Sequence, residues 1–221
     1  MYLKGISLPL LRYMRIDNFD LIKDKLFHDM GEEEFYFLQI IVRGKDNNTN
    51  SNRLVKYYTI YSAEQLDKYK NEIIGICKLS NARAYIHPTK RNAKNVAGVA
   101  LELAAHDFVS QNWIGLKSVY STACGKSFVI SDKKFIVDLD DIEIGSKSFC
   151  EIESFIAKLR GHGGEGVSKT FMAVPTAHGC HLVTYPFDLG EFGRIYQGID
   201  VHKNNPTLLY YENDSESWRQ G

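Results

Sequence analysis

The amino-acid sequence predicts a mixed α+β fold. Segments that are rich in β-branched and aromatic residues alternate along the chain with longer segments whose apolar residues recur every three or four positions. These two patterns are typical of strands and of amphipathic helices, respectively. No internal repeat interrupts the alternation. We therefore expect one or two α/β layers rather than an all-helical or all-β domain.

Turn and cap signals divide the N-terminal half into elements. The Asn- and Asp-rich loop 45–53 predicts a hairpin between its two flanking strands. Ser62 is expected to cap a helix, with Gln65 at the capping-box position. In order, we expect a helix over Ile16–Met30, strands over Glu34–Arg43 and Leu54–Tyr61, a helix that begins after Ser62, a strand over Ala82–Ile86 and a helix over Ala93–Val109.

The C-terminal half shows the same alternation of patterns. Gly161 is expected to end a helix, and the strand that follows this helix either runs parallel, as in a βαβ crossover, or returns antiparallel. The expected segments are strands over Phe128–Ile130 and Lys134–Leu139, a helix over Ser148–Arg160, and strands over Thr170–Val174, Cys180–Tyr185 and Thr207–Tyr211.

Composition limits the class of protein. The chain has 221 residues, of which 44% are hydrophobic and 24% charged, as in ordinary globular proteins. No run approaches the ~18 apolar residues of a membrane span, and Met1–Leu11 lacks a signal-peptide pattern, so we expect a cytoplasmic protein without a membrane partner. The formal net charge is zero, and contacts to nucleic acid must therefore come from local basic patches.

Two carboxylates lie close together in the predicted strand 134–139 and just after it. Side chains two residues apart in a strand share a face, so Asp138 and Asp140 point one way while Val137 and Leu139 point the other. Adjacent carboxylates repel each other unless a cation lies between them, and Mg²⁺ and Mn²⁺ prefer oxygen ligands. The pair predicts a metal site. The alternative is a solvated strand end, because the acidic run continues to Glu143.

Two further motifs follow in the chain. The first, Thr176 to His181, has the form T-x-x-G-x-H and leads into an apolar strand. The second places Asp200 among β-branched residues, shortly before Thr207–Tyr211. His181 has two interpretations, a phosphate-binding side chain or a core histidine.

The ordered triplet of motifs over residues 130–211 resembles the archaeo-eukaryotic primase superfamily. That superfamily includes primase small subunits, primase-polymerases and the polymerase domain of bacterial end-joining ligases. Its members carry a hydrophobic-D-x-D/E motif, a small-residue turn that ends in His, and a hydrophobic-D motif. The chain is most similar to the small primase-like proteins of phages and mobile elements. Segments 39–46 and 82–86 also resemble those proteins.

The resemblance implies an activity and a site. It implies a template-dependent nucleotidyltransferase, a DNA/RNA primase or primase-polymerase, that uses two divalent ions, Mg²⁺ or Mn²⁺, ~4 Å apart. Asp138, Asp140 and Asp200 would be the catalytic and metal-binding residues. The residues expected to bind the incoming nucleotide are Thr176, Gly179, His181 and Lys203. The candidates for binding nucleic acid are Arg43, Lys45, Arg83, Lys90, Arg91 and Lys126.

The resemblance also implies an architecture and partners. It implies a primase-polymerase core in which an RRM-like sheet carries the acids and packs against an N-terminal α/β layer. The layer is expected over residues 1–121 and the palm-like part over residues 122–221, as one compact unit. For the three motifs to converge, the strands near 134–140, 180–185 and 207–211 should be neighbours in one sheet, with Asp200 at its edge. The helix Ser148–Arg160 should pack against Val137 and Leu139, on the face opposite to the acids. Single-stranded DNA and nucleoside triphosphates would be substrates, with a replicative helicase as a further partner.

Two other functions fit the same residues. A metal-dependent nuclease would use the same three acids, with Lys133 or Lys134 positioning water. A non-catalytic accessory protein would bind nucleic acid or nucleotide through a vestigial site. Zero net charge argues against a protein that works by non-specific binding alone.

Overall fold

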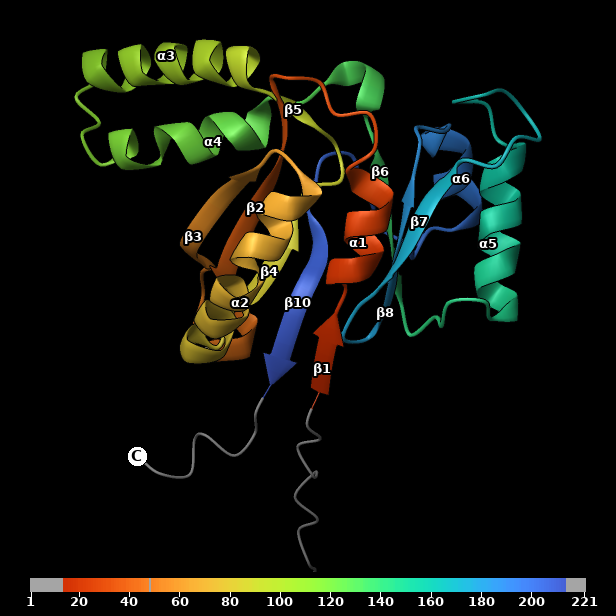
Figure 1. Cartoon of the computed structure of the whole chain (residues 1–221). Coiled ribbons are helices and arrows are strands. Elements are labelled where there is room, and N and C mark those ends of the chain that lie inside the picture. The colour runs from red at the N-terminus through yellow and green to blue at the C-terminus, as the bar shows by residue number, and fades with distance from the viewer. Residues whose placement is uncertain (1–13, 48, 214–221) are drawn as a thin grey trace, which may run out of the picture.

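A computed structural model of the chain describes residues 14–47 and 49–213. It shows an α+β protein with two antiparallel sheets (Figure 1). The fold class predicted from the sequence is therefore confirmed. No helix in this described part is long and apolar enough to cross a membrane.

The larger sheet joins the two ends of the described chain. Its strand order is β1-β10-β4-β2-β3, and the short β5 pairs with the start of β2. The strands are β1 (Met14–Asp17), β2 (Glu34–Val42), β3 (Arg53–Ile60), β4 (Arg83–Ile86), β5 (Arg91–Asn92) and β10 (Thr207–Asn213). As predicted, β2 and β3 form a hairpin.

The position of β10 differs from the prediction. We expected the strands near 134–140, 180–185 and 207–211 to be neighbours in one sheet, and this is wrong for the last of them. Residues 207–211 are all buried, so this strand needs cover on both faces, and it lies between β1 and β4. An apolar run shows that a strand is buried but does not show which partner strands bury it.

The smaller sheet has the strand order β7-β8-β6-β9, and every pair is antiparallel. Its elements follow one another in the chain as strand, helix, strand, strand, helix, strand. They are β6 (Phe135–Asp140), α5 (Lys147–Lys158), β7 (Thr170–Pro175), β8 (Gly179–Thr184), α6 (Leu189–Ile195) and β9 (Val201–His202). The strand after α5 is therefore not the neighbour of β6, because β8 lies between them.

Helices α5 and α6 cover one face of the smaller sheet. Val137 and Leu139 share a buried cluster with Phe149 and Ile152 of α5 and with Phe192 of α6. This confirms the predicted packing of the amphipathic helix on the side of β6 opposite to Asp138. The carboxylate face of the sheet therefore points away from both helices.

The opposite face of the smaller sheet packs toward the larger sheet. Ile136 and Val183 belong to the same buried cluster as Leu38 and Ile40 of β2. The helices α1 (Phe19–Leu26) and α2 (Ala63–Ser80) contribute to that cluster, and Figure 1 shows α1 between the two sheets. On this face of β6, the side chains that lie outside the buried cluster can line a space between the two sheets.

Local chemistry explains where several helices begin. As predicted, the Ser62 hydroxyl accepts a hydrogen bond from the backbone N–H of Gln65 at the start of α2. The first helix, by contrast, begins later than expected, because Ile16 belongs to β1. Asn18 separates β1 from α1, and its side-chain amide donates to the carbonyls of Leu208 and Pro175 at 2.9 and 3.0 Å.

A pair of helices covers the remaining face of β2. The helices α3 (Ala93–Val109) and α4 (Val119–Lys126) bury Val96, Ala123 and Cys124 against Phe35 and Phe37. The sequence did not predict α4, α6, β1, β5 or β9. The strand predicted over 128–130 is wrong, because Ile130–Asp132 form a 3-10 turn, η3.

Candidate active-site cleft

The β6–β8 ladder places Asp138 opposite His181. Paired residues in an antiparallel ladder project to the same face, and His181 Nε2 lies 3.5 Å from Asp138 Oδ1. The other ring nitrogen, Nδ1, is hydrogen-bonded to the hydroxyl of Thr207 at 2.9 Å. A side chain from each sheet thus holds the imidazole ring in one orientation.

The β6–β9 ladder brings the third predicted acid beside the first. The backbone N–H of Asp138 donates to the carbonyl of Asp200 at 2.9 Å. The adjoining pairs are Val137 with Val201 and Ile136 with His202. Asp138 therefore lies between His181 of β8 and Asp200, the residue that precedes β9.

The turn before β8 depends on a glycine. Gly179 has φ of +154°, and a Cβ at this position would lie 2.0 Å from the carbonyl oxygen of Leu139. Only glycine allows β8 to approach the end of β6 this closely. The backbone N–H of Thr176 donates to the carbonyl of Gly179 at 3.0 Å, so it closes the hairpin rather than pointing at a ligand.

Two adjoining cavities lie between the sheets, with volumes of about 80 and 460 Å³. Arg43, Tyr85, Asp138 and His181 line both of them. We call the combined space the cleft. The smaller cavity also has Asp140, Thr176 and Arg83 in its wall. The larger cavity is further lined by polar side chains that include Gln39, Asn52, His87, His202 and Asn204.

Burial sets the charge of the histidines in the cleft. Burial lowers the pKa of His181, while the nearby Asp138 carboxylate acts in the opposite direction and His202 lowers the pKa further. His87 has a pKa well below the ordinary value, because it is buried and faces the Arg91 guanidinium. Both rings are therefore neutral at pH 7.

Two of the predicted basic residues reach the cleft. Arg43 lines both of its cavities. Arg83 lines the smaller one, but its guanidinium forms a bidentate pair with Asp46 at 2.8 and 3.0 Å and lies over the ring of Tyr211. Asp46 thus holds the guanidinium group of Arg83 in place. A phosphate group that binds Arg83 would have to displace Asp46 or bind beside it.

Arg91 has a structural position instead. Its side chain is 0% exposed and donates to the carbonyls of Thr89 and Cys124, to His87 Nδ1 and to Asn204 Oδ1. Because burial removes it from any surface, it does not reach nucleic acid in this structure. It links β5 and α4 to the segment that follows β9.

The remaining predicted basic residues lie outside the cleft. Lys90 forms an ion pair with Glu34 at 2.7 Å. Lys45, Lys126 and Lys203 are exposed, and none of the three lines the cavities described above.

Sequence reasoning missed several residues of the cleft. His202 lies two positions after Asp200, so the period of a strand was a signal that would have pointed to it. Gln39 and Tyr85 fall in the segments 39–46 and 82–86 that were singled out from the sequence, but neither residue was given a role there, and Asn204 carries no local signal. Only the pairing of the two sheets brings these three residues to the cleft.

The donor chemistry of the cleft fits a hard divalent cation, since carboxylate oxygens are its preferred ligands. Asp138 and Asp140 share a face of β6, and Asp200 lies opposite Asp138. Within residues 14–47 and 49–213, however, no three His, Cys, Asp or Glu side chains converge closely enough to hold an ion. The backbone positions fit such a site, while the side chains are not gathered around a common point.

The fold and the cleft define an α+β protein with an acidic, histidine-containing site between two sheets. Comparison of the chain with models of protein families, with curated proteins and with solved structures returned no match. The function is therefore argued from the residues of the cleft and their geometry.

Proposed function

We propose that this protein is a template-dependent nucleotidyltransferase of the primase or primase-polymerase type. The observation that carries the proposal is the strand register around Asp138. It pairs Asp138 with His181 on one face of the sheet and sets the backbone of Asp200 against that of Asp138, although Asp200 itself is exposed and lines neither cavity of the cleft. That face opens into a cleft with Arg43 and Arg83 in its wall.

The topology of the smaller sheet supports the same class. A strand-helix-strand-strand-helix-strand unit with this antiparallel order is the ferredoxin-like arrangement, which is also that of RRM domains. We propose that it is the RRM-like sheet of a primase-polymerase core and that the larger sheet is the N-terminal layer. Because β10 pairs with β4, residues 207–213 would join the two parts into one compact unit.

The residues of the cleft have distinct proposed roles. Asp138, Asp140 and Asp200 would hold Mg²⁺ or Mn²⁺, which supplies activation of the attacking hydroxyl and charge neutralisation on the triphosphate. The neutral His181, oriented by Thr207, would bind a phosphate oxygen as a hydrogen-bond donor from Nε2. Arg43 and Arg83 would neutralise charge on the triphosphate or the template.

The nuclease alternative loses one of its two candidates for positioning water, Lys134. Lys134 is buried, and its ammonium group binds Asp132 at 2.7 Å. It lies four residues before Asp138 in an extended strand, which corresponds to ~13 Å. The accessory-protein alternative is favoured by one observation, namely that the three acids do not converge in the described part of the chain.

One assay separates the three functions. The protein is incubated with a single-stranded DNA template, with and without an annealed primer, and with labelled nucleoside triphosphates and Mn²⁺, and the products are resolved by length. Products longer than the primer, or new oligomers, are expected. Shortened template would indicate a nuclease, and unchanged substrates would indicate a binding protein.

The matched control replaces only the acids. The double variant Asp138→Asn with Asp140→Asn should abolish extension, because it removes the charge that holds the ions. Without metal ions it should stay folded and melt no lower than the wild type, because loss of two adjacent like charges relieves repulsion. Extension at the wild-type rate by this folded variant would contradict the proposed site.

A further inference from the structure

A second cavity, of about 500 Å³, lies away from the cleft. Its walls come from η3 and the residue after it, Lys133, from the turn after α5 and from the segment between β8 and α6. We call it the aromatic cavity. Its volume lies within the range of ligand pockets, ~300–1,000 Å³.

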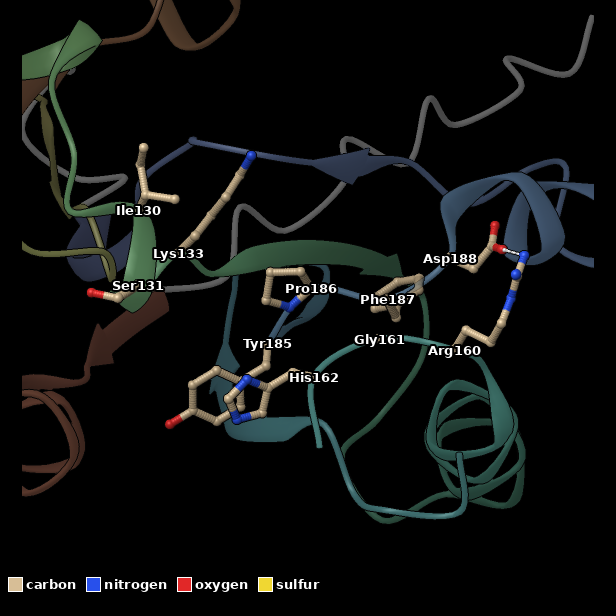
Figure 2. Close-up of a pocket in the computed structure, with 10 residues that line it drawn as sticks. All are labelled: Ile130, Ser131, Lys133, Arg160, Gly161, His162, Tyr185, Pro186, Phe187 and Asp188. Carbon is tan, nitrogen blue, oxygen red and sulfur yellow. Dashed lines mark hydrogen bonds and ion pairs between the residues drawn. The ribbon is translucent and has the colours of Figure 1, made fainter. Parts of the chain in front are cut away.

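A stacked pair of rings forms one wall. The rings of His162 and Tyr185 lie 4.2 Å apart with an interplanar angle of 15°, and Figure 2 shows them ring against ring below Pro186 and Phe187. His162 is exposed, whereas Tyr185 is partly buried. The exposed ring of His162 is thus supported on one face by the ring of Tyr185.

The backbone behind this wall is held rigidly. Gly161 has φ of +153°, and a Cβ there would lie 2.3 Å from the carbonyl oxygen of Pro186. The N–H of His162 donates to the same carbonyl at 2.9 Å, and the N–H of Asp188 donates to the carbonyl of Arg160 at 2.9 Å. The stacked pair is therefore part of a fixed surface, which lowers the entropic cost of binding a ligand.

The charge of the aromatic cavity is positive. Arg160 is paired with Asp188 at 2.9 Å. The ammonium group of Lys133 lies 5.3 Å from the ring centroid of Phe128 and 5.6 Å from that of Phe135. In the part of the chain that the structure describes, Lys133 takes part in no ion pair, unlike its neighbour Lys134. Lys133 is thus left to meet an anion at the rim of the cavity, and Figure 2 shows it on the other side of Pro186 from the stacked rings.

An aromatic platform and a cation in the walls of one cavity match the chemistry of a nucleotide. Proteins that bind single strands stack bases on aromatic side chains and place cations along the phosphates. We propose that the aromatic cavity binds one nucleotide unit of a single-stranded nucleic acid, with a base against His162 and a phosphate beside Lys133. The choice of a nucleic acid over another planar anion rests on the proposed function.

The test measures binding without catalysis. A fluorescent oligothymidylate is titrated without metal ions or nucleoside triphosphates, in the Asp138→Asn, Asp140→Asn background. Adding His162→Ala with Lys133→Gln should weaken binding roughly ten- to a hundredfold. The slope of log affinity against log salt should become shallower by about 0.7, the value for one phosphate contact on a single strand. The control His106→Ala with Lys158→Gln changes exposed residues elsewhere and should leave the affinity unchanged.

Two further measurements locate the site and its ligand. Photo-crosslinking with an iodouracil-substituted strand should mark the peptide that contains His162 or Tyr185. Free thymidine monophosphate, titrated in parallel, should bind far more weakly than the strand. Equal affinity of the cavity variant and the control, or crosslinks confined to the cleft, would overturn the inference. A loss seen only with free monophosphate would also overturn it. The background variant is not expected to extend a primer, so these binding measurements do not depend on catalysis. They can be interpreted whether or not the wild-type protein has the proposed activity.

Discussion

At the scale of single residues, the site depends on how each side chain is oriented by its neighbours. His181 is the clearest case, because Thr207 from the larger sheet binds one ring nitrogen and Asp138 lies near the other. This arrangement presents a neutral ring edge to the cleft. Because His181 contacts a residue of each sheet, its orientation depends on the two sheets staying packed together.

His181→Ala should weaken nucleoside-triphosphate binding more than template binding, because the residue is proposed to contact phosphate. A charge-assisted hydrogen bond contributes ~1.5–3 kcal/mol, so the affinity for nucleotide should fall roughly ten- to a hundredfold. Isothermal titration with a non-hydrolysable triphosphate measures the change. The exposed His106 on α3 provides the control variant, His106→Ala. General unfolding of His181→Ala, with no specific loss of nucleotide affinity, would show a core residue instead.

The buried histidines predict how stability depends on pH. Burial lowers the pKa of His87 and His181 below the ordinary 6.5, so below pH 6.5 the unfolded chain binds more protons than the folded one. Their contribution to stability is therefore complete above pH 6.5 and is lost as the pH falls from 6.5 toward the lowered values. The melting temperature should decrease in that window, as followed by circular dichroism. His181→Gln should make the decrease shallower, whereas His106→Gln should leave it unchanged; an identical slope in both variants would contradict this account.

At the scale of elements, the β6–β8–β9 ladder converts spacing in the chain into proximity in space. The ladder can form only if β8 comes close to the end of β6, which Gly179 permits. The site therefore depends on Gly179, a residue that has no side chain to take part in the proposed chemistry.

Gly179→Ala should destabilise the protein by about 1–3 kcal/mol through backbone strain alone, with a further cost from the contact with the Leu139 carbonyl. Chemical denaturation measures this loss. Gly98→Ala, in α3, is the matched control, because a Cβ there meets nothing within 4 Å. That change should stabilise the protein by ~0.5–1 kcal/mol. Equal effects of the two substitutions would mean that the close approach of β8 is unimportant.

At the scale of the whole molecule, the cleft exists because two sheets of different topology pack through a shared core. Leu38 and Ile40 of one sheet meet Ile136 and Val183 of the other. Polar residues at the margin of this contact line the cleft. Arg91 and Asn204 tie the segment after β9 to the helical layer.

Mn²⁺ should raise the melting temperature by mass action if Asp138, Asp140 and Asp200 form a site in solution. At a free concentration one hundred times the dissociation constant, the gain is about 2.7 kcal/mol, or several degrees for a protein of this size. Differential scanning fluorimetry measures the shift. It should vanish in Asp138→Asn with Asp140→Asn and persist in Glu151→Gln with Glu153→Gln, which removes two acids from α5. An equal shift in all three proteins would remove the metal site from consideration.

Local signals in the sequence were sufficient for the fold class and for many elements. The bounds of α3 were predicted correctly, as were the cap at Ser62 and the β2–β3 hairpin. The packing of α5 on Val137 and Leu139 followed from the periods of helix and strand. These features depend on interactions between residues that are close in the chain.

Of the candidate site, the sequence predicted the acids, His181 and Thr176, whose motifs are short and contiguous, and two of the basic residues that line the cleft, Arg43 and Arg83. It gave no role to Tyr85 or Asn204, did not indicate the hydrogen bond between His181 and Thr207, and suggested a surface role for Arg91, which is buried. These features depend on contacts between distant segments, which no local pattern records.

What the sequence by itself determined is the set of elements and which face of each is apolar, because periodicity and caps are properties of neighbouring residues. What only the tertiary structure decided is the partner of each strand outside the β2–β3 hairpin. It placed β10 in the larger sheet and β8 between β6 and β7, since any buried strand can satisfy its hydrogen bonds with any other. That choice of partners, made by the packing of the whole core, is what set Asp138 between His181 and Asp200.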